Sequence, residues 1–177
     1  AAVVAKDIAR RGTRPAAPTL GCVRVHDGVV TVDVSGEDIA LETSLDGVVW
    51  DRRDALFTQS PPFEIVAPQS ILYVRARAES PAGISDPSDV YAVRAGDRQV
   101  LLVDADDRWQ RQPTNENVMG AAHDFMATYA AALPAGVGFD TCPNEALSDL
   151  APGLVAYDAI VWATGEETAQ GIVPAGI

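Results

Sequence analysis

The segment QVLLVDADDRW, residues 99–109, joins a short apolar run to three carboxylates, an arginine and a tryptophan. The apolar run, residues 100–103, is too short for an ordinary helix and does not alternate with polar residues. It therefore predicts a strand buried on both faces, as in a parallel sheet. In open α/β sheets, ligands bind outside the carboxyl ends of the strands. The polar residues after this strand are therefore a candidate ligand site: Asp104, Asp106, Asp107, Arg108 and Trp109.

The composition is that of a globular and strongly acidic chain. Of the 177 residues, 47% are hydrophobic, and the formal net charge is −12. A negative field of this size repels phosphate backbones, and no cluster of Lys and Arg offsets it, so we expect no nucleic acid partner. The sequence has no run of eighteen apolar residues, so we predict no membrane span.

Residues 1–13 predict a short helix. Val3, Val4 and Ile8 recur at helical spacing, and Gly12 follows the last turn as a C-cap. The helix has no N-cap, which leaves two interpretations open. It is either the end of an upstream domain or a short helix that packs on the next domain.

Residues 14–95 predict an antiparallel β-sandwich. Short segments with strand character are separated by turn residues, and VVTVDV, residues 29–34, alternates as a half-buried strand does. Seven short strands at regular spacing are typical of a sandwich. The predicted strands are 19–25, 29–34, 39–44, 48–50, 63–66, 71–78 and 91–94.

Residues 96–177 predict the first part of an α/β domain with a parallel sheet. Strands at 100–103, 139–142 and 157–163 alternate with helical segments at 114–133 and 146–156. This alternation favours parallel pairing through right-handed crossovers. With three strands the sheet is incomplete, and a parallel strand at an open edge exposes unpaired backbone groups. We therefore expect residues 160–163 to be covered by another chain, a missing continuation or a neighbouring molecule.

Two further acids, Glu166 and Glu167, follow the third strand and would share the same edge of the sheet as the aspartates. Clustered carboxylates suit Mg²⁺ or Ca²⁺. However, an aspartate nucleophile motif of the D-x-D-x-T kind would need threonine in place of Arg108. We favour a solvated acidic loop with an Asp–Arg108 ion pair over a metal site, and we assign no cofactor.

No catalytic residue is assigned within the chain. Neither histidine has a second ligand at metal-binding spacing, and no G-x-C-x-G elbow is present to carry a nucleophile. Cys22 and Cys142 lie far apart in different predicted domains, so we expect two thiols rather than a disulfide.

The sandwich region resembles a fibronectin type III domain. The resemblance lies in PAAPTL, SLDGVVWD and YVRARAESPAGISDPSDVYAV, and the matching positions are Arg75, Ala78, Gly83, Ser85, Pro87 and Ser88. The family's tyrosine before that arginine is replaced by Leu72, and Tyr73 is one place out of register. The resemblance implies a spacer or binding module without chemistry.

The second half, in VLLVDADDRW, GFDTC and YDAIVWATGEE, resembles the start of a flavodoxin-like domain related to class I glutamine amidotransferases. Such domains accompany fibronectin type III repeats in secreted bacterial proteins, some with an N-acetylmuramoyl-L-alanine amidase domain. Residues 3–11, VVAKDIARR, resemble the closing helix of that amidase.

Together, the resemblances imply a non-catalytic, extracytoplasmic accessory region that spaces or binds, with cell-wall polysaccharide or peptidoglycan as the candidate partner. Two alternatives stay open. In the first, the chain is part of a cell-wall amidase whose zinc site precedes residue 1. In the second, it is part of an α/β hydrolase whose nucleophile lies beyond Ile177.

Overall fold

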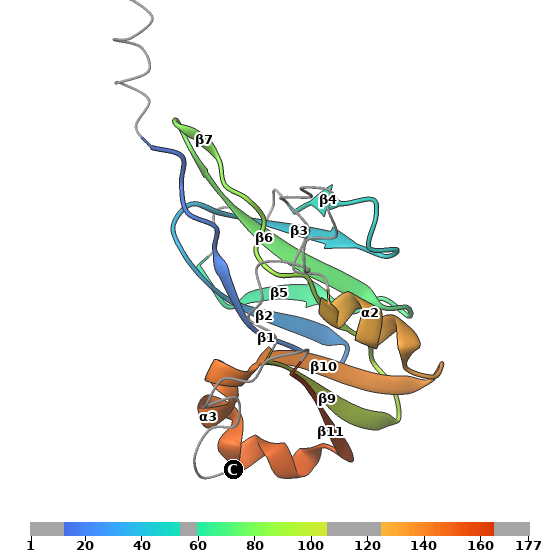
Figure 1. The fold of residues 1–177 in the computed structure, drawn as a ribbon. Helices are drawn as coiled ribbons and strands as arrows, with labels where there is room; N and C mark the ends of the chain where they lie inside the picture. The colour runs from blue at the N-terminus through green and yellow to red at the C-terminus, as the bar shows by residue number, and fades with distance from the viewer. Residues whose placement is uncertain (1–12, 54–59, 106–124, 165–177) are drawn as a thin grey trace, which may run out of the picture.

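Two β-sheets with few helices make up the described part of the chain. The computed structural model describes residues 13–53, 60–105 and 125–164 (Figure 1). One sheet has six strands in the order β11-β9-β10-β1-β2-β5. The other has the order β4-β3-β6-β7, with β8 also paired to β6.

The described residues up to residue 93 supply eight strands. They are β1 (Thr19–His26), β2 (Val29–Ser35), β3 (Ile39–Ser44), β4 (Asp51–Arg52), β5 (Phe63–Val66), β6 (Leu72–Ser80), β7 (Gly83–Ile84) and β8 (Tyr91–Val93). All described pairs among them are antiparallel. The β1–β2 hairpin turns at Asp27 and Gly28, which both have positive φ, as a two-residue hairpin turn requires.

The predicted strand at residues 48–50 is wrong. The Asp46 carboxylate accepts hydrogen bonds from the backbone N–H groups of Val48 and Val49, both at 2.8 Å. These two amides are therefore satisfied by a side chain instead of a strand ladder, and both valine side chains are exposed. β3 pairs with β6 on one side and with β4 on the other, and β4 begins directly after the predicted segment.

The second part of the chain alternates strands and helical turns. Its elements are β9 (Arg98–Asp104), α2 (Phe125–Ala132), β10 (Val137–Pro143), η2 (Asn144–Ala146), α3 (Leu147–Leu150), η3 (Ala151–Ala156) and β11 (Ala159–Ala163). Residues 114–124 of the predicted first helix lie outside the described residues. None of the described helices is long and apolar enough to cross a membrane.

The predicted parallel layer is confirmed. β9 pairs in parallel with both β10 and β11, and Ile160 lies opposite Leu101. Both faces of β9 are covered, as its unbroken apolar run indicates. Val100 and Leu102 join the core shared with the antiparallel strands, while Leu101 and Val103 pack with Leu147 on the other face.

The six-stranded sheet contains strands from both predicted regions. β10 lies beside β1 in an antiparallel pair, with Val23 opposite Thr141. The next pair in this register is Cys22 and Cys142, which form a disulfide. The expectation of two thiols is therefore wrong. Residues 120 positions apart in sequence are neighbours because the sheet continues from the antiparallel strands into the parallel strands.

We predict that the disulfide is a major contributor to stability. A cross-link between residues so far apart restricts the unfolded chain and stabilises the fold by about 3–5 kcal/mol. The double variant Cys22→Ser/Cys142→Ser should lose about this free energy of unfolding in urea titrations. Wild-type protein unfolded with a reducing agent present serves as the control and should match the variant. Equal midpoints for oxidised wild type and the variant would contradict the prediction.

Candidate functional site

The carboxyl ends of β9, β10 and β11 lie together, as the sequence predicts. Asp104 is in register with Pro143 on one side and with Ala163 on the other. The Ala105 N–H donates to the Ala163 carbonyl at 2.9 Å and holds the strand ends together. Of the predicted site residues, Asp104 is described. The remaining ones, Asp106, Asp107, Arg108, Trp109, Glu166 and Glu167, lie outside the described residues.

Asp104 faces Tyr91 of the neighbouring sheet. The Tyr91 side chain is 2% exposed, and its hydroxyl donates a hydrogen bond to the Asp104 carboxylate. Burial raises the pKa of Tyr91 well above its ordinary value, and the negative charges of Asp104, Asp89 and Glu145 raise it further. The structure therefore places a neutral phenol against the first carboxylate of the predicted site.

No metal centre is found among the residues that the structure describes. Within these ranges, no group of three or more His, Cys, Asp or Glu side chains is arranged to hold a metal ion. The Mg²⁺ or Ca²⁺ site considered from the sequence needs Asp106 and Asp107, which fall outside these ranges. Asp104 alone supplies one carboxylate, whereas both cations prefer several oxygen ligands.

A second acidic site lies at the junction of β1 and β10. Asp140 is 5% exposed and accepts hydrogen bonds from the Val25 N–H at 2.8 Å and from the Tyr157 hydroxyl at 2.7 Å. Burial raises the pKa of Asp140, while the two hydrogen bonds and the nearby Arg24 and His26 act in the opposite direction. Both carboxylate oxygens accept hydrogen bonds, so Asp140 links β1 and β10 to the residue that follows η3.

Asp140 is not among the site residues predicted from the sequence. The signal that could have found it is its place in GFDTC, inside a predicted buried strand. A carboxylate there needs hydrogen-bonding partners because an unpaired buried charge is costly. The partners themselves could not be predicted, because Val25 is 115 positions away and Tyr157 follows a helical segment.

Further polar contacts connect β8 to β10. The Thr141 hydroxyl donates to the Ala92 carbonyl at 2.6 Å. Arg94 and Phe139 exchange two backbone hydrogen bonds, and the Arg94 guanidinium donates to the Val137 carbonyl at 2.8 Å. These contacts attach the second sheet to β10, so the parallel strands are held by antiparallel strands of both sheets.

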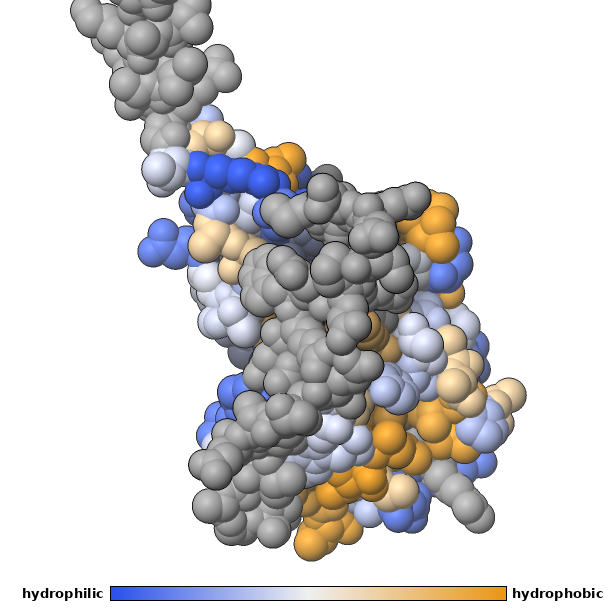
Figure 2. All heavy atoms as spheres, viewed as in Figure 1, coloured by the Kyte–Doolittle hydropathy of each residue, from blue (hydrophilic) through white to orange (hydrophobic). Residues whose placement is uncertain are grey.

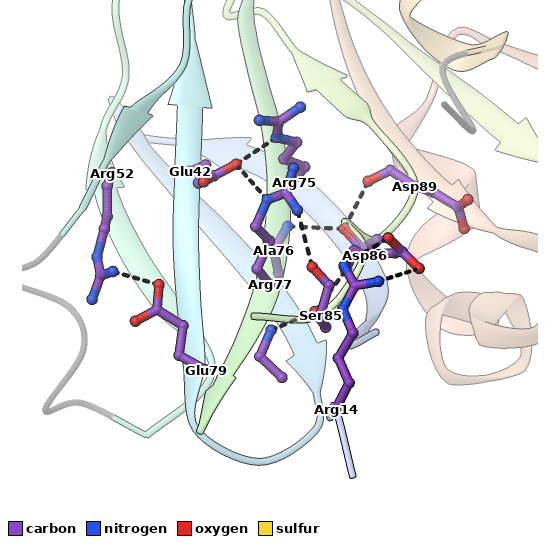
Figure 3. Close-up of polar contacts among 12 residues, drawn as sticks. Arg14, Glu42, Arg52, Arg75, Ala76, Arg77, Glu79, Ser85, Asp86 and Asp89 are labelled. Atoms are coloured by element: carbon purple, nitrogen blue, oxygen red, sulfur yellow. Dashed lines mark hydrogen bonds and ion pairs between the residues drawn. The ribbon is translucent and has the colours of Figure 1, made fainter. Parts of the chain in front are cut away.

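The residues that carry the resemblance to fibronectin type III have structural roles. The Ser85 hydroxyl oxygen accepts the Ala78 N–H at 2.8 Å, and the Ser88 hydroxyl oxygen accepts the Ala76 N–H at 2.9 Å. These serines thus satisfy backbone donors of β6 where a partner strand is missing. Figure 3 shows these contacts beside the charged side chains of β3 and β6.

Charged side chains of the second sheet form two separate groups of ion pairs (Figure 3). Glu42 accepts from Arg75 at 2.5 Å and from Arg77 at 3.4 Å, and the Arg75 guanidinium lies 4.0 Å from the centre of the Trp50 ring. Arg52 forms an ion pair with Glu79. The charges are thus paired within the sheet, and these contacts account for the positions of the arginines.

The sequence matches no protein-family model, and a search of curated proteins also finds no match.

We predict that two substitutions at Asp140 distinguish the contribution of its hydrogen bonds to stability from the contribution of its charge. Asp140→Ala leaves the buried Val25 N–H and the partly buried Tyr157 hydroxyl without this acceptor and should cost about 2–4 kcal/mol of unfolding free energy. Asp140→Asn keeps an acceptor for the Val25 N–H and carries no charge, so it should stay within about 1 kcal/mol of wild type at pH 7, or exceed it. Urea titrations of both variants measure the difference. Equal losses in the two variants would contradict this assignment.

The pH dependence provides a separate check on Asp140. Its folded-state pKa is raised above the ordinary value of 3.8. The folded state therefore binds the proton more tightly than the unfolded state does. The stabilisation that results is fully present below pH 3.8 and is lost as the pH rises through the folded-state pKa. The advantage of Asp140→Asn over wild type should accordingly shrink as the pH falls toward 3.8.

We predict that Tyr91→Phe destabilises the fold by about 1–3 kcal/mol, because the Asp104 carboxylate loses a charge-assisted hydrogen bond. The raised pKa of Tyr91 also means that wild type loses stability as the pH rises above the ordinary tyrosine value of 10.0. The variant should lose less over that range. Tyr129→Phe is the matched control, since Tyr129 is 42% exposed. Comparable effects of the two substitutions would rule out a special role for Tyr91.

Proposed function

We propose that these residues form a non-catalytic accessory region of a larger extracytoplasmic bacterial protein, which spaces or binds. The observation that carries the proposal is the junction between β1 and β10. There the sandwich strands and the parallel strands share one sheet, and the Cys22–Cys142 disulfide links the two strands covalently. A region joined in this way suits a rigid spacer, since its two parts keep a fixed orientation.

The hydrogen bonds that Asp140 and Asp104 accept support a structural role for these two acids. Asp140 has both oxygens in hydrogen bonds, and Asp104 accepts from a buried tyrosine hydroxyl. A general base needs a free lone pair within reach of a substrate proton. These two carboxylates instead accept hydrogen bonds from the protein's own donors, which supports positioning over proton transfer.

The finer fold proposal rests on strand order. The parallel strands run β10-β9-β11, which in chain order is 2-1-3 and corresponds to the first three strands of the flavodoxin-like order 2-1-3-4-5. The antiparallel strands β1–β8 lie in two sheets, as a fibronectin-like sandwich would have them. Both observations support the resemblances seen in the sequence.

The disulfide also supports the proposed location. Disulfides persist in oxidising compartments and are rare where thiols are kept reduced. Both cysteines are buried, Cys142 completely, and they pack with Leu101, Val103 and Leu147. A cross-link inside a hydrophobic cluster fits a structural bond in a protein outside the cytoplasm.

We predict that the two parts tumble as one body. Backbone ¹⁵N relaxation should give the same rotational correlation time for amides of β2 and β6 as for amides of β9 and β10. The measurement is made on the wild-type protein. The same measurement on the Cys22→Ser/Cys142→Ser variant shows how much the disulfide contributes to the common tumbling of the two parts. Two clearly different correlation times in the wild-type protein would overturn the rigid-spacer proposal.

A pelleting assay with purified peptidoglycan distinguishes a spacer from a region that binds the cell wall. If the region binds the cell wall, it should pellet with peptidoglycan, and if it only spaces, it should remain in the supernatant. In both cases the region should release no soluble muropeptides or glycan fragments. Release of such fragments would show that these residues are themselves catalytic.

A further inference from the structure

The chain crosses the start of β10 on its way from β8 to β9. Arg94 and Phe139 exchange backbone hydrogen bonds of 3.0 and 2.8 Å, on the edge of β10 that also pairs with β1. Shortly after, Arg98 pairs with Val137 on the opposite edge of β10, where β9 lies. Residues 95–97 must therefore cross β10, and they connect the antiparallel strands to the parallel strands.

Gly96 lies at this crossing, where no side chain fits. A Cβ atom added to Gly96 would lie 2.3 Å from the Gly138 nitrogen, 2.8 Å from the Gly138 Cα and 2.6 Å from the Gly136 oxygen. All three are backbone atoms, which cannot rotate away as the end of a side chain can. Ordinary contact begins near 3.4 Å, so a side chain at this position would separate the linker from β10 by about 1 Å. Gly96 does not have a positive φ, so close approach, and not backbone conformation, requires the glycine.

Arg94 holds the same end of β10 through its side chain. Its guanidinium donates hydrogen bonds to the carbonyl oxygens of Val137 at 2.8 Å, Pro134 at 2.6 Å and Leu133 at 3.5 Å. The guanidinium carbon also lies 5.3 Å from the centre of the Phe139 ring. Leu133 and Pro134 directly follow α2, and cationic side chains commonly bind the carbonyls at the end of a helix. This one side chain therefore joins the end of α2 to the start of β10.

The helix that Arg94 holds shares a core with the strand that precedes the linker. Met126 and Ala130 of α2 belong to the same hydrophobic cluster as Tyr91 and Val93 of β8. Figure 1 draws α2 beside β10, and Figure 2 shows apolar residues gathered on this part of the molecule. Contacts on both sides of the linker therefore restrict its rotation.

We propose that residues 94–97 form a fixed joint, which sets the orientation of the parallel strands relative to the antiparallel strands without help from the disulfide. The Cys22–Cys142 bond lies near the opposite end of β10. A strand held at one point can rotate about it, whereas β10 is also held at its start by Arg94 and Gly96. The inference rests on the proposed rigid spacer, and it means that the spacer keeps its geometry under reducing as well as oxidising conditions.

Residual dipolar couplings of backbone amides, measured on the whole chain in a weakly aligned sample and fitted to the wild-type structure, test the proposal. In wild type, amides of β2 and β6 should fit the same alignment tensor as amides of β9 and β10. The Cys22→Ser/Cys142→Ser variant should also fit one tensor. In Gly96→Ala the linker and β10 are forced apart, so the two groups of amides should require tensors with different axes.

Gly153→Ala is the matched control, because a Cβ atom there meets no other atom within 4 Å. It should fit one tensor as wild type does, and circular dichroism checks that every variant is folded. If Gly96→Ala does not fold, Arg94→Met takes its place. This substitution removes the guanidinium and keeps the backbone hydrogen bonds of residue 94, so it should also require two tensors.

The outcomes separate the joint from the spacer. A folded Gly96→Ala variant that fits a single tensor would overturn the joint and leave the rigid spacer standing. A cysteine variant that needs two tensors, or that no longer folds, would also overturn the joint, because the disulfide would then fix the orientation. Two tensors in the wild-type protein would instead contradict the rigid spacer, and the joint with it.

Discussion

The antiparallel pairing of β1 with β10 is the constraint on which the rest of the structure depends. Without it, β1 would be an open edge of the antiparallel strands and β10 an open edge of the parallel strands. Unpaired strand edges expose rows of backbone donors and acceptors. Each strand covers the other, so neither half is complete without its neighbour. The disulfide and the buried Asp140 both lie on this pairing because it brings the two halves within bonding distance.

The pairing is short, and side chains extend it. Val23 and Thr141 form the one backbone register pair between β1 and β10 that the described residues show. Two residues further along β1, the Val25 N–H donates to the Asp140 carboxylate, so a side chain takes the place of a carbonyl. On the same edge of β10, Phe139 pairs with Arg94. The edge of β10 is thus shared between the two sheets, which explains how one strand anchors both.

Much of the fold could be predicted from the sequence, because local patterns determine it. The alternation of apolar and polar residues predicted β2. The unbroken apolar run of β9 predicted that both of its faces are buried and that its pairing is parallel. The partners across the junction could not be predicted, because they depend on how the two halves meet. Cys22, Cys142 and Asp140 each acquire their role only from that contact. The strand expected at residues 48–50 failed for a local reason, since the side chain of Asp46 competes with strand pairing.

The junction also changes what the candidate site can do. Because β10 is attached to both sheets, β8 lies close enough to the carboxyl end of β9 for Tyr91 to reach Asp104. In an isolated parallel sheet this carboxylate would face a crevice open to ligands. Here one of its hydrogen bonds goes to a buried tyrosine, and replacing that bond with a ligand would leave the hydroxyl unsatisfied. Asp104, the first acid of the predicted ligand site, therefore already has a structural role in the fold.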